Sequence, residues 1–122
     1  MLASTPAEPI LQALRRELER AKIILELILS KAPRKDETIS YELTPAIHFD
    51  LDGIYSQLQL ARRIIEESDD LDPRIREVAL NVIYEFFKFL RQGFREQHFT
   101  PRNISDMIYI IERAIKVTSS SK

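Results

Sequence analysis

The sequence contains no cysteine, and only two of its 122 residues are glycine. The lack of cysteine excludes disulfide bonds and thiolate zinc sites, and it fits a reducing compartment. So few glycines, with six prolines that can all stand at element boundaries, favour long helices over many short strands. No stretch approaches about 18 uncharged apolar residues, so we expect no transmembrane segment. The N-terminus also lacks the features of a signal peptide, which predicts a cytoplasmic protein.

Composition indicates an ordinary globular domain. The chain is 44% hydrophobic and 30% charged, and its formal net charge is −1. A length of 122 residues corresponds to about one domain, so residues 1–122 are expected to form a single domain. A net charge this close to zero gives no general attraction to nucleic acid or anionic lipid.

A helix-start signal occurs four times along the chain. A Thr or Asp, whose oxygen can cap the free amides of a first turn, is followed directly by proline, which suits the first helical position. The four pairs are Thr5-Pro6, Thr44-Pro45, Asp72-Pro73 and Thr100-Pro101. We therefore predict helices over about residues 6–30, 45–68, 73–97 and 101–117, with a linker over 30–43 and a frayed tail over 118–122.

Apolar residues recur at helical spacing in each predicted helix, which gives each one a single apolar face. In the first helix the face is Leu11, Leu14, Leu18, Ala21, Leu25 and Ile28, widened by Ile10, Ile24 and Leu27, and in the second it is Ile47, Leu51, Ile54, Leu58, Ala61 and Ile65. In the third helix the face is Ile75, Ala79, Val82, Phe86 and Leu90, and in the fourth it is Ile104, Met107, Ile108, Ile111 and Ile115. Short connections make neighbouring helices antiparallel. The predicted fold is all-α, a single antiparallel four-helix bundle.

Two features of these apolar faces bear on partners. Phe86, Phe87, Phe89 and Phe94 do not all fit one narrow face, so we expect one or two of them to be exposed and to mark a contact surface. The seam of the first helix is regular enough to pair with a second copy, which leaves a homodimer open.

The segment "IHFDLDGIY", residues 47–55, is similar to the first motif of haloacid-dehalogenase phosphatases. That resemblance would make Asp50 the nucleophile and Asp52 the general acid. Such an enzyme also needs a parallel sheet and further motifs, whereas helical seams follow here. Asp50 and Asp52 at the start of a helical turn suit the helix dipole without any chemistry, which is the simpler interpretation. The same segment is too short for a calcium loop.

Arg91 and His98 are separated by six residues, and this spacing resembles the signature of HEPN ribonucleases. In that family the pair works across a dimer interface, and the histidine assists attack by a ribose hydroxyl. A histidine near the end of a helix is also typical of capping. A HEPN-like ribonuclease or toxin that uses Arg91 and His98 is therefore one alternative function.

A basic stripe is the second alternative. Lys88, Arg91, Arg95, His98 and Arg102 recur at helical spacing, and residues 88–102 carry four basic residues and one acidic one. Such a stripe would suit a helical nucleic-acid-binding subunit of a larger assembly. It lacks the interleaved exposed aromatic residues that single-strand binding uses. A solvated helix face is the simpler interpretation.

Catalytic constellations are otherwise missing from the sequence. The two histidines fall in different segments, and no glycine-rich phosphate loop is present. We therefore expect no enzymatic activity, no catalytic residues, no cofactor and no metal site.

Residues 72–115 resemble the later half of the pediocin-like (class IIa) bacteriocin immunity proteins, the enterocin A immunity group. The features that carry the resemblance are an aromatic third helix with Tyr84, Phe86 and Phe87, a corner with Phe99-Thr100, and an amphipathic helix over 104–114. The resemblance implies a cytosolic four-helix binding protein without catalysis. Members of this family protect the producing cell at the sugar-uptake permease that the bacteriocin attacks.

The resemblance also suggests where a partner binds, since family specificity is associated with the C-terminal half. It implies a membrane-proximal protein partner at the corner between the third and fourth helices. With the basic stripe included, the partner-binding candidates are Lys88, Arg91, Arg95, His98, Arg102, Asn103, Tyr109 and Arg113.

Overall fold

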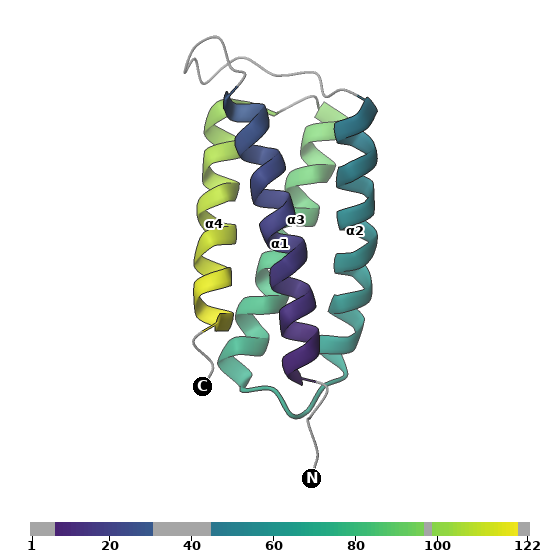
Figure 1. The fold of residues 1–122 in the computed structure, drawn as a ribbon, viewed down its shortest axis with the longest axis vertical. Helices are drawn as coiled ribbons and strands as arrows, with labels where there is room; N and C mark the ends of the chain where they lie inside the picture. The colour runs from purple at the N-terminus through teal and green to yellow at the C-terminus, as the bar shows by residue number, and fades with distance from the viewer. Residues whose placement is uncertain (1–6, 31–44, 97–98, 120–122) are drawn as a thin grey trace.

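The computed structural model describes residues 7–30, 45–96 and 99–119, and these form four helices. They are α1 (Ala7–Ser30), α2 (Pro45–Glu66), α3 (Pro73–Glu96) and α4 (Pro101–Ser119). The helices run alternately up and down (Figure 1). Each packs on its neighbours in the order α1, α2, α3, α4, and α4 returns to α1. The predicted all-α antiparallel four-helix bundle is confirmed.

The helix ends differ slightly from the prediction. α2 ends at Glu66 and not at residue 68, whereas α3 extends to Glu96, the last residue described before the corner. The frayed tail was placed too early, because α4 continues through Thr118 and Ser119. The Thr118 hydroxyl is fully buried and donates to the Ala114 carbonyl at 2.8 Å, so this last turn is anchored in the bundle. Residue 6, the 31–43 part of the linker, and residues 97 and 120–122 lie outside the described residues.

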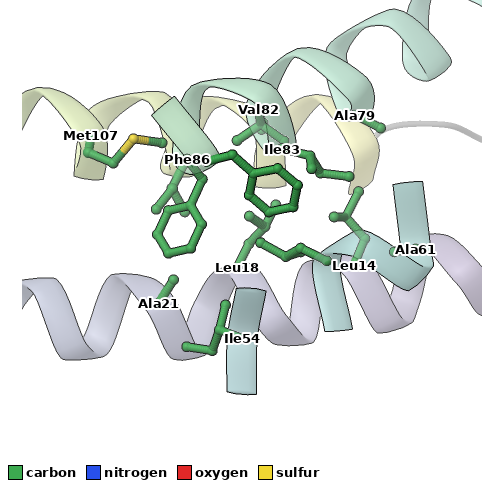
Figure 2. Packing of buried hydrophobic residues seen from close by; sticks show 14 of the residues in the cluster. Leu14, Leu18, Ala21, Ile54, Ala61, Ala79, Val82, Ile83, Phe86 and Met107 are labelled. Atoms are coloured by element: carbon green, nitrogen blue, oxygen red, sulfur yellow. The ribbon is translucent and has the colours of Figure 1, made fainter. Parts of the chain in front are cut away.

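The predicted apolar faces form the core. Every seam residue of α1 from Leu11 to Ile28 is buried, and Phe86 at the centre of α3 has no exposed surface. Figure 2 shows Phe86 among Leu18 of α1, Ile54 of α2 and Met107 of α4. Ile47 and Ile115, at the ends of their seams, are half-buried. The bundle thus buries the α1 seam within one chain.

Two expectations about exposed apolar residues were wrong. Leu27 does not widen the apolar face of α1, because it lies opposite the seam and is 47% exposed. None of the α3 phenylalanines is exposed: Phe89 and Phe94 are half-buried because both pack against Phe99, with ring centroids 5.5 and 5.3 Å from it. The exposed phenylalanine is Phe49 of α2, at 78%.

Polar contacts link α1 to α4, the first and last helices of the bundle. Arg15 donates from Nη1 to the Thr118 carbonyl at 2.8 Å and from Nη2 to Glu8 Oε2 at 2.9 Å. Lys22 Nζ lies 3.3 Å from Glu112 Oε2, and the hydrogen bond to this carboxylate raises the pKa of Lys22. The contacts to Thr118 and Glu112 join the first helix to the last, whereas the contact to Glu8 lies within α1.

Two of the predicted caps are present. Asp72 Oδ1 accepts from the Arg74 amide at 2.9 Å, and Thr100 Oγ1 accepts from the Asn103 amide at 3.2 Å. Each side chain satisfies an amide that the first turn of a helix leaves unpaired. Thr5 and Thr44 lie outside the described residues.

Arg76 of α3 caps the end of α2. Its Nε donates to the Ile65 carbonyl at 3.2 Å, and its Nη2 donates to the Glu66 carbonyl. The last turn of a helix leaves its carbonyls without helical partners. The Ile65 carbonyl also accepts from the Ser68 amide at 3.2 Å, so Arg76 is its second donor. The cationic donor also opposes the negative end of the α2 dipole.

We predict that Arg76→Ala lowers the free energy of unfolding by about 1–2 kcal/mol, because charged hydrogen bonds to two carbonyls at the end of α2 are lost. Urea unfolding measures the change. Arg74→Ala is the matched control: Arg74 is exposed two residues earlier, and the hydrogen bond that it makes to Asp72 uses its backbone amide. Equal stability of the two variants would contradict the capping role.

Candidate partner-binding surface

A groove runs between α3 and α4 on the outside of the bundle. Its larger section has a volume of about 580 Å³. The floor is apolar and includes Val78, Val82 and Ala114, while the walls carry polar side chains. Its lining residues are Glu77, Val78, Asn81, Val82, Glu85, Tyr109, Ile110, Arg113 and Ala114.

A second section of about 290 Å³ continues toward the corner where α3 ends and α4 begins. It is lined by Glu85, Lys88, Phe89, Gln92, Asn103, Asp106, Met107 and Ile110. The two sections meet at Glu85 and Ile110, which line both, and together they are called the α3–α4 groove. From Glu77 to Gln92 it follows about 22 Å of α3, which is the length of a helix of about 15 residues.

The walls of the α3–α4 groove combine an exposed aromatic ring with charges of both signs. Tyr109 is 67% exposed on the α4 side. Lys88 Nζ lies 3.3 Å from Glu85 Oε1, which joins two positions one turn apart on the α3 wall. Exposed tyrosine side chains beside an apolar surface are typical of protein-binding sites, because the ring is apolar and its hydroxyl can hydrogen-bond. The groove can therefore bury an apolar side chain while its rim hydrogen-bonds a partner.

The groove unites four of the predicted partner-binding residues. Lys88, Asn103, Tyr109 and Arg113 all line it, although they come from two helices and span residues 88–113. Arg91 and Arg95 are exposed on α3 but do not line the groove. Arg102 is exposed in the first turn of α4. His98 lies outside the described residues.

The basic stripe over residues 88–102 does not continue along one helix. Its spacing assumed an unbroken helical path, but α3 ends at Glu96 and α4 begins at Pro101. Phe99 and Thr100 are both buried at this corner, and Thr100 starts the new helix. Lys88, Arg91 and Arg95 thus share α3, whereas Arg102 belongs to α4.

Sequence reasoning missed most of the groove itself. Glu77, Asn81, Glu85 and Asp106 form its walls, and Ile110 joins its two sections. The one available signal was the set of apolar residues beside the seams: Val78 and Ile110 are half-buried because they flank the α3–α4 contact. Val78 and Ile110 mark the edges of the α3–α4 interface. The size of the groove, however, depends on the distance between α3 and α4.

The segment similar to the phosphatase motif lies inside a helix. Asp50 and Asp52 are exposed in α2 beyond its first turn, and no strand occurs within the described ranges. The phosphatase motif requires the end of a parallel strand, so this resemblance is contradicted.

Among residues 7–30, 45–96 and 99–119, no group of three or more His, Cys, Asp or Glu is placed to hold a metal ion. None of the helices in those ranges combines the length and apolarity needed to cross a bilayer.

Comparison with known proteins gives no relative for this chain. No protein-family model matches it, and neither a curated protein nor a solved structure is significantly similar to it.

Proposed function

We propose that the chain is a cytoplasmic, non-enzymatic helical interaction protein that binds a protein partner in the α3–α4 groove. The observation that supports it best is the meeting of Lys88, Asn103, Tyr109 and Arg113 along one groove with an apolar floor. A groove of this length between two helices suits an amphipathic helix of the partner.

The sharpest form of the proposal is bacteriocin immunity. Residues 72–115, which resemble the class IIa immunity proteins, contain all of α3 and most of α4, and therefore both walls of the groove. In this form the partner is the membrane-embedded permease together with its bacteriocin. The bundle would approach that complex from the cytoplasmic side and present Tyr109 and Arg113 to it.

The test is a killing assay in a strain sensitive to class IIa bacteriocins. The wild-type chain is expected to protect the cells, and Asn81→Trp is expected to reduce survival at least about tenfold, since a large ring on the groove wall fills the space that the partner needs. Gln57→Trp is the matched control, because Gln57 is equally an exposed helical position but lies on α2. It should protect like the wild type.

Two outcomes would count against the proposal. Absence of protection by a folded, expressed wild-type chain against a panel of class IIa bacteriocins would remove the immunity form. Full protection by Asn81→Trp would remove the groove as the binding surface. Circular dichroism of each variant shows whether a loss of protection reflects lost binding or lost folding.

A further inference from the structure

A second surface lies on the outer side of α3, beside the α3–α4 groove. Tyr84, Lys88, Arg91 and Arg95 follow one another at intervals of four, three and four residues, which places them along one face of the helix. Tyr84 is 59% exposed, and both arginines are exposed. We name these four residues the α3 outer stripe. Lys88 belongs both to this stripe and to the groove wall.

The α3 outer stripe carries uncompensated positive charge. Glu85 lies 3.3 Å from Lys88, and both side chains are partly exposed, so their pairing is weak. Within the described residues, neither Arg91 nor Arg95 forms an ion pair. Three cations therefore stand along about 10 Å of helix, and Glu85 is the one carboxylate that pairs with any of them among the described residues. Such a local excess attracts anions even though the whole chain is close to neutral.

Flat aromatic groups accompany these cations. The Lys88 ammonium lies 5.6 Å from the centre of the Tyr84 ring. On the α2 side of α3, the Tyr55 ring packs against Phe87 with centroids 4.4 Å apart and planes tilted by 41°, and the Arg62 guanidinium lies 5.9 Å from the centre of the Phe87 ring. Sequence reasoning found no aromatic residue interleaved with the basic stripe, because Tyr84 comes one turn before residue 88 and Tyr55 comes from another helix.

We propose that the α3 outer stripe binds single-stranded nucleic acid, with Lys88, Arg91 and Arg95 on the phosphates and Tyr84 stacked on a base. Positive charge combined with exposed rings is the arrangement that binds single strands with little sequence preference. This second surface is separate from the proposed binding of a protein in the α3–α4 groove and does not depend on it.

A membrane surface fits the stripe less well. Binding at a lipid interface needs apolar side chains that insert beside the basic ones. In the part of the chain that the structure describes, the large exposed aliphatic residues are Ile23, Leu27 and Leu60, which lie on α1 and α2 and not on α3. The stripe offers an aromatic ring and guanidinium planes, which stack on bases, but no aliphatic side chain to bury in lipid.

The test is fluorescence anisotropy with labelled oligo-dT and oligo-rU of about 12 nucleotides, a length within the usual range of single-strand sites. The wild-type chain is expected to bind at low salt. Three phosphate contacts predict a slope near −2 for log K against log salt, or about a hundredfold loss over a tenfold rise in salt. Lys88→Gln/Arg91→Gln/Arg95→Gln should abolish this slope and weaken binding at least about tenfold. Tyr84→Ala should weaken binding about tenfold with the slope unchanged, and Tyr84→Phe should bind like the wild type.

The matched control is Arg16→Gln/Arg20→Gln/Lys116→Gln, which removes the same charge from exposed positions on α1 and α4. It is expected to retain most of the affinity, as a localised site requires. Equal losses in the two triple variants would overturn the proposal, as would no binding by the wild type at low salt. Stripe-dependent binding to phosphatidylglycerol vesicles without binding to either oligonucleotide would also overturn it, and would assign the stripe to membranes.

Discussion

Replacing Gly93 with alanine is expected to lower the free energy of unfolding by about 3 kcal/mol, near the upper end of the usual cost of overpacking. Gly93 is buried in α3, and a Cβ added there would overlap the Cε1, Cζ and Cε2 atoms of Phe99. The Phe99 ring is 3% exposed and lies between Phe89 and Phe94, so it has no free space to move into. Urea or thermal unfolding followed by circular dichroism measures the loss.

Gly53→Ala is the matched control for this prediction. Gly53 lies in α2, where an added Cβ would meet nothing within 4 Å. Alanine is favoured over glycine inside a helix by about 1 kcal/mol, so this variant should be more stable than the wild type. The same substitution thus changes sign between two helices because only one of the glycines lies under a ring.

A double variant identifies the cause of the Gly93 effect. In a Phe99→Ala background the overlapping ring is gone, so adding Gly93→Ala should cost little and can gain about 1 kcal/mol from helix propensity. If Gly93→Ala were equally damaging with and without the Phe99 ring, the close contact at the α3–α4 corner would not be its cause.

Phe86→Ala is expected to lower the free energy of unfolding by about 4 kcal/mol, within the range for deletion of a buried phenylalanine. Phe86 is the largest side chain with no exposed surface, and it lies where side chains of α1, α2 and α4 meet (Figure 2). Its removal leaves a cavity that rigid helices cannot easily close. Small domains are stable by about 5–15 kcal/mol, so this variant should lie close to unfolding.

Phe49→Ala removes the same atoms from a surface position. Phe49 is 78% exposed on α2, and its truncation should change stability by less than about 0.5 kcal/mol. Denaturant unfolding of both variants tests the contrast. A cost for Phe49→Ala comparable to that for Phe86→Ala would mean that the apolar surface of α2 is covered in solution, for example by a second copy.

The fold could be predicted because the helix-start residues and the spacing of the apolar residues indicate the same helices. The seam of α1 repeats with helical spacing from Leu11 to Ile28, and every one of its residues is buried. Asp72 and Thr100 cap the helices that their sequence positions predicted. The end of α4 was harder to place, because Thr118 and Ser119 are polar and carry no periodic signal. Their hydroxyls bond to carbonyls of the preceding turn, an arrangement that serine and threonine adopt within helices as well as at their ends.

The candidate surfaces were predicted only in part. Tyr109 and Arg113 were selected through a family resemblance, and they do lie together on the groove wall. The groove itself depends on the distance between α3 and α4, which no periodicity encodes. Arg102 was grouped with Lys88 because helical spacing was carried across the corner. The buried residues Phe99 and Thr100 interrupt that path, and their burial is a property of the folded chain.

The order in which the four helices pack around the bundle also affects how the chain folds. Arg76 reaches the end of α2 across 11 residues, whereas Arg15 reaches the Thr118 carbonyl across 103. The entropy of loop closure grows as the logarithm of loop length, so the longer connection costs about 2 kcal/mol more. We therefore expect α2, α3 and α4 to assemble from near neighbours first, with the α1–α4 interface forming late. Arg15 and Lys22 would then govern mainly how fast the protein unfolds, and hardly how fast it folds.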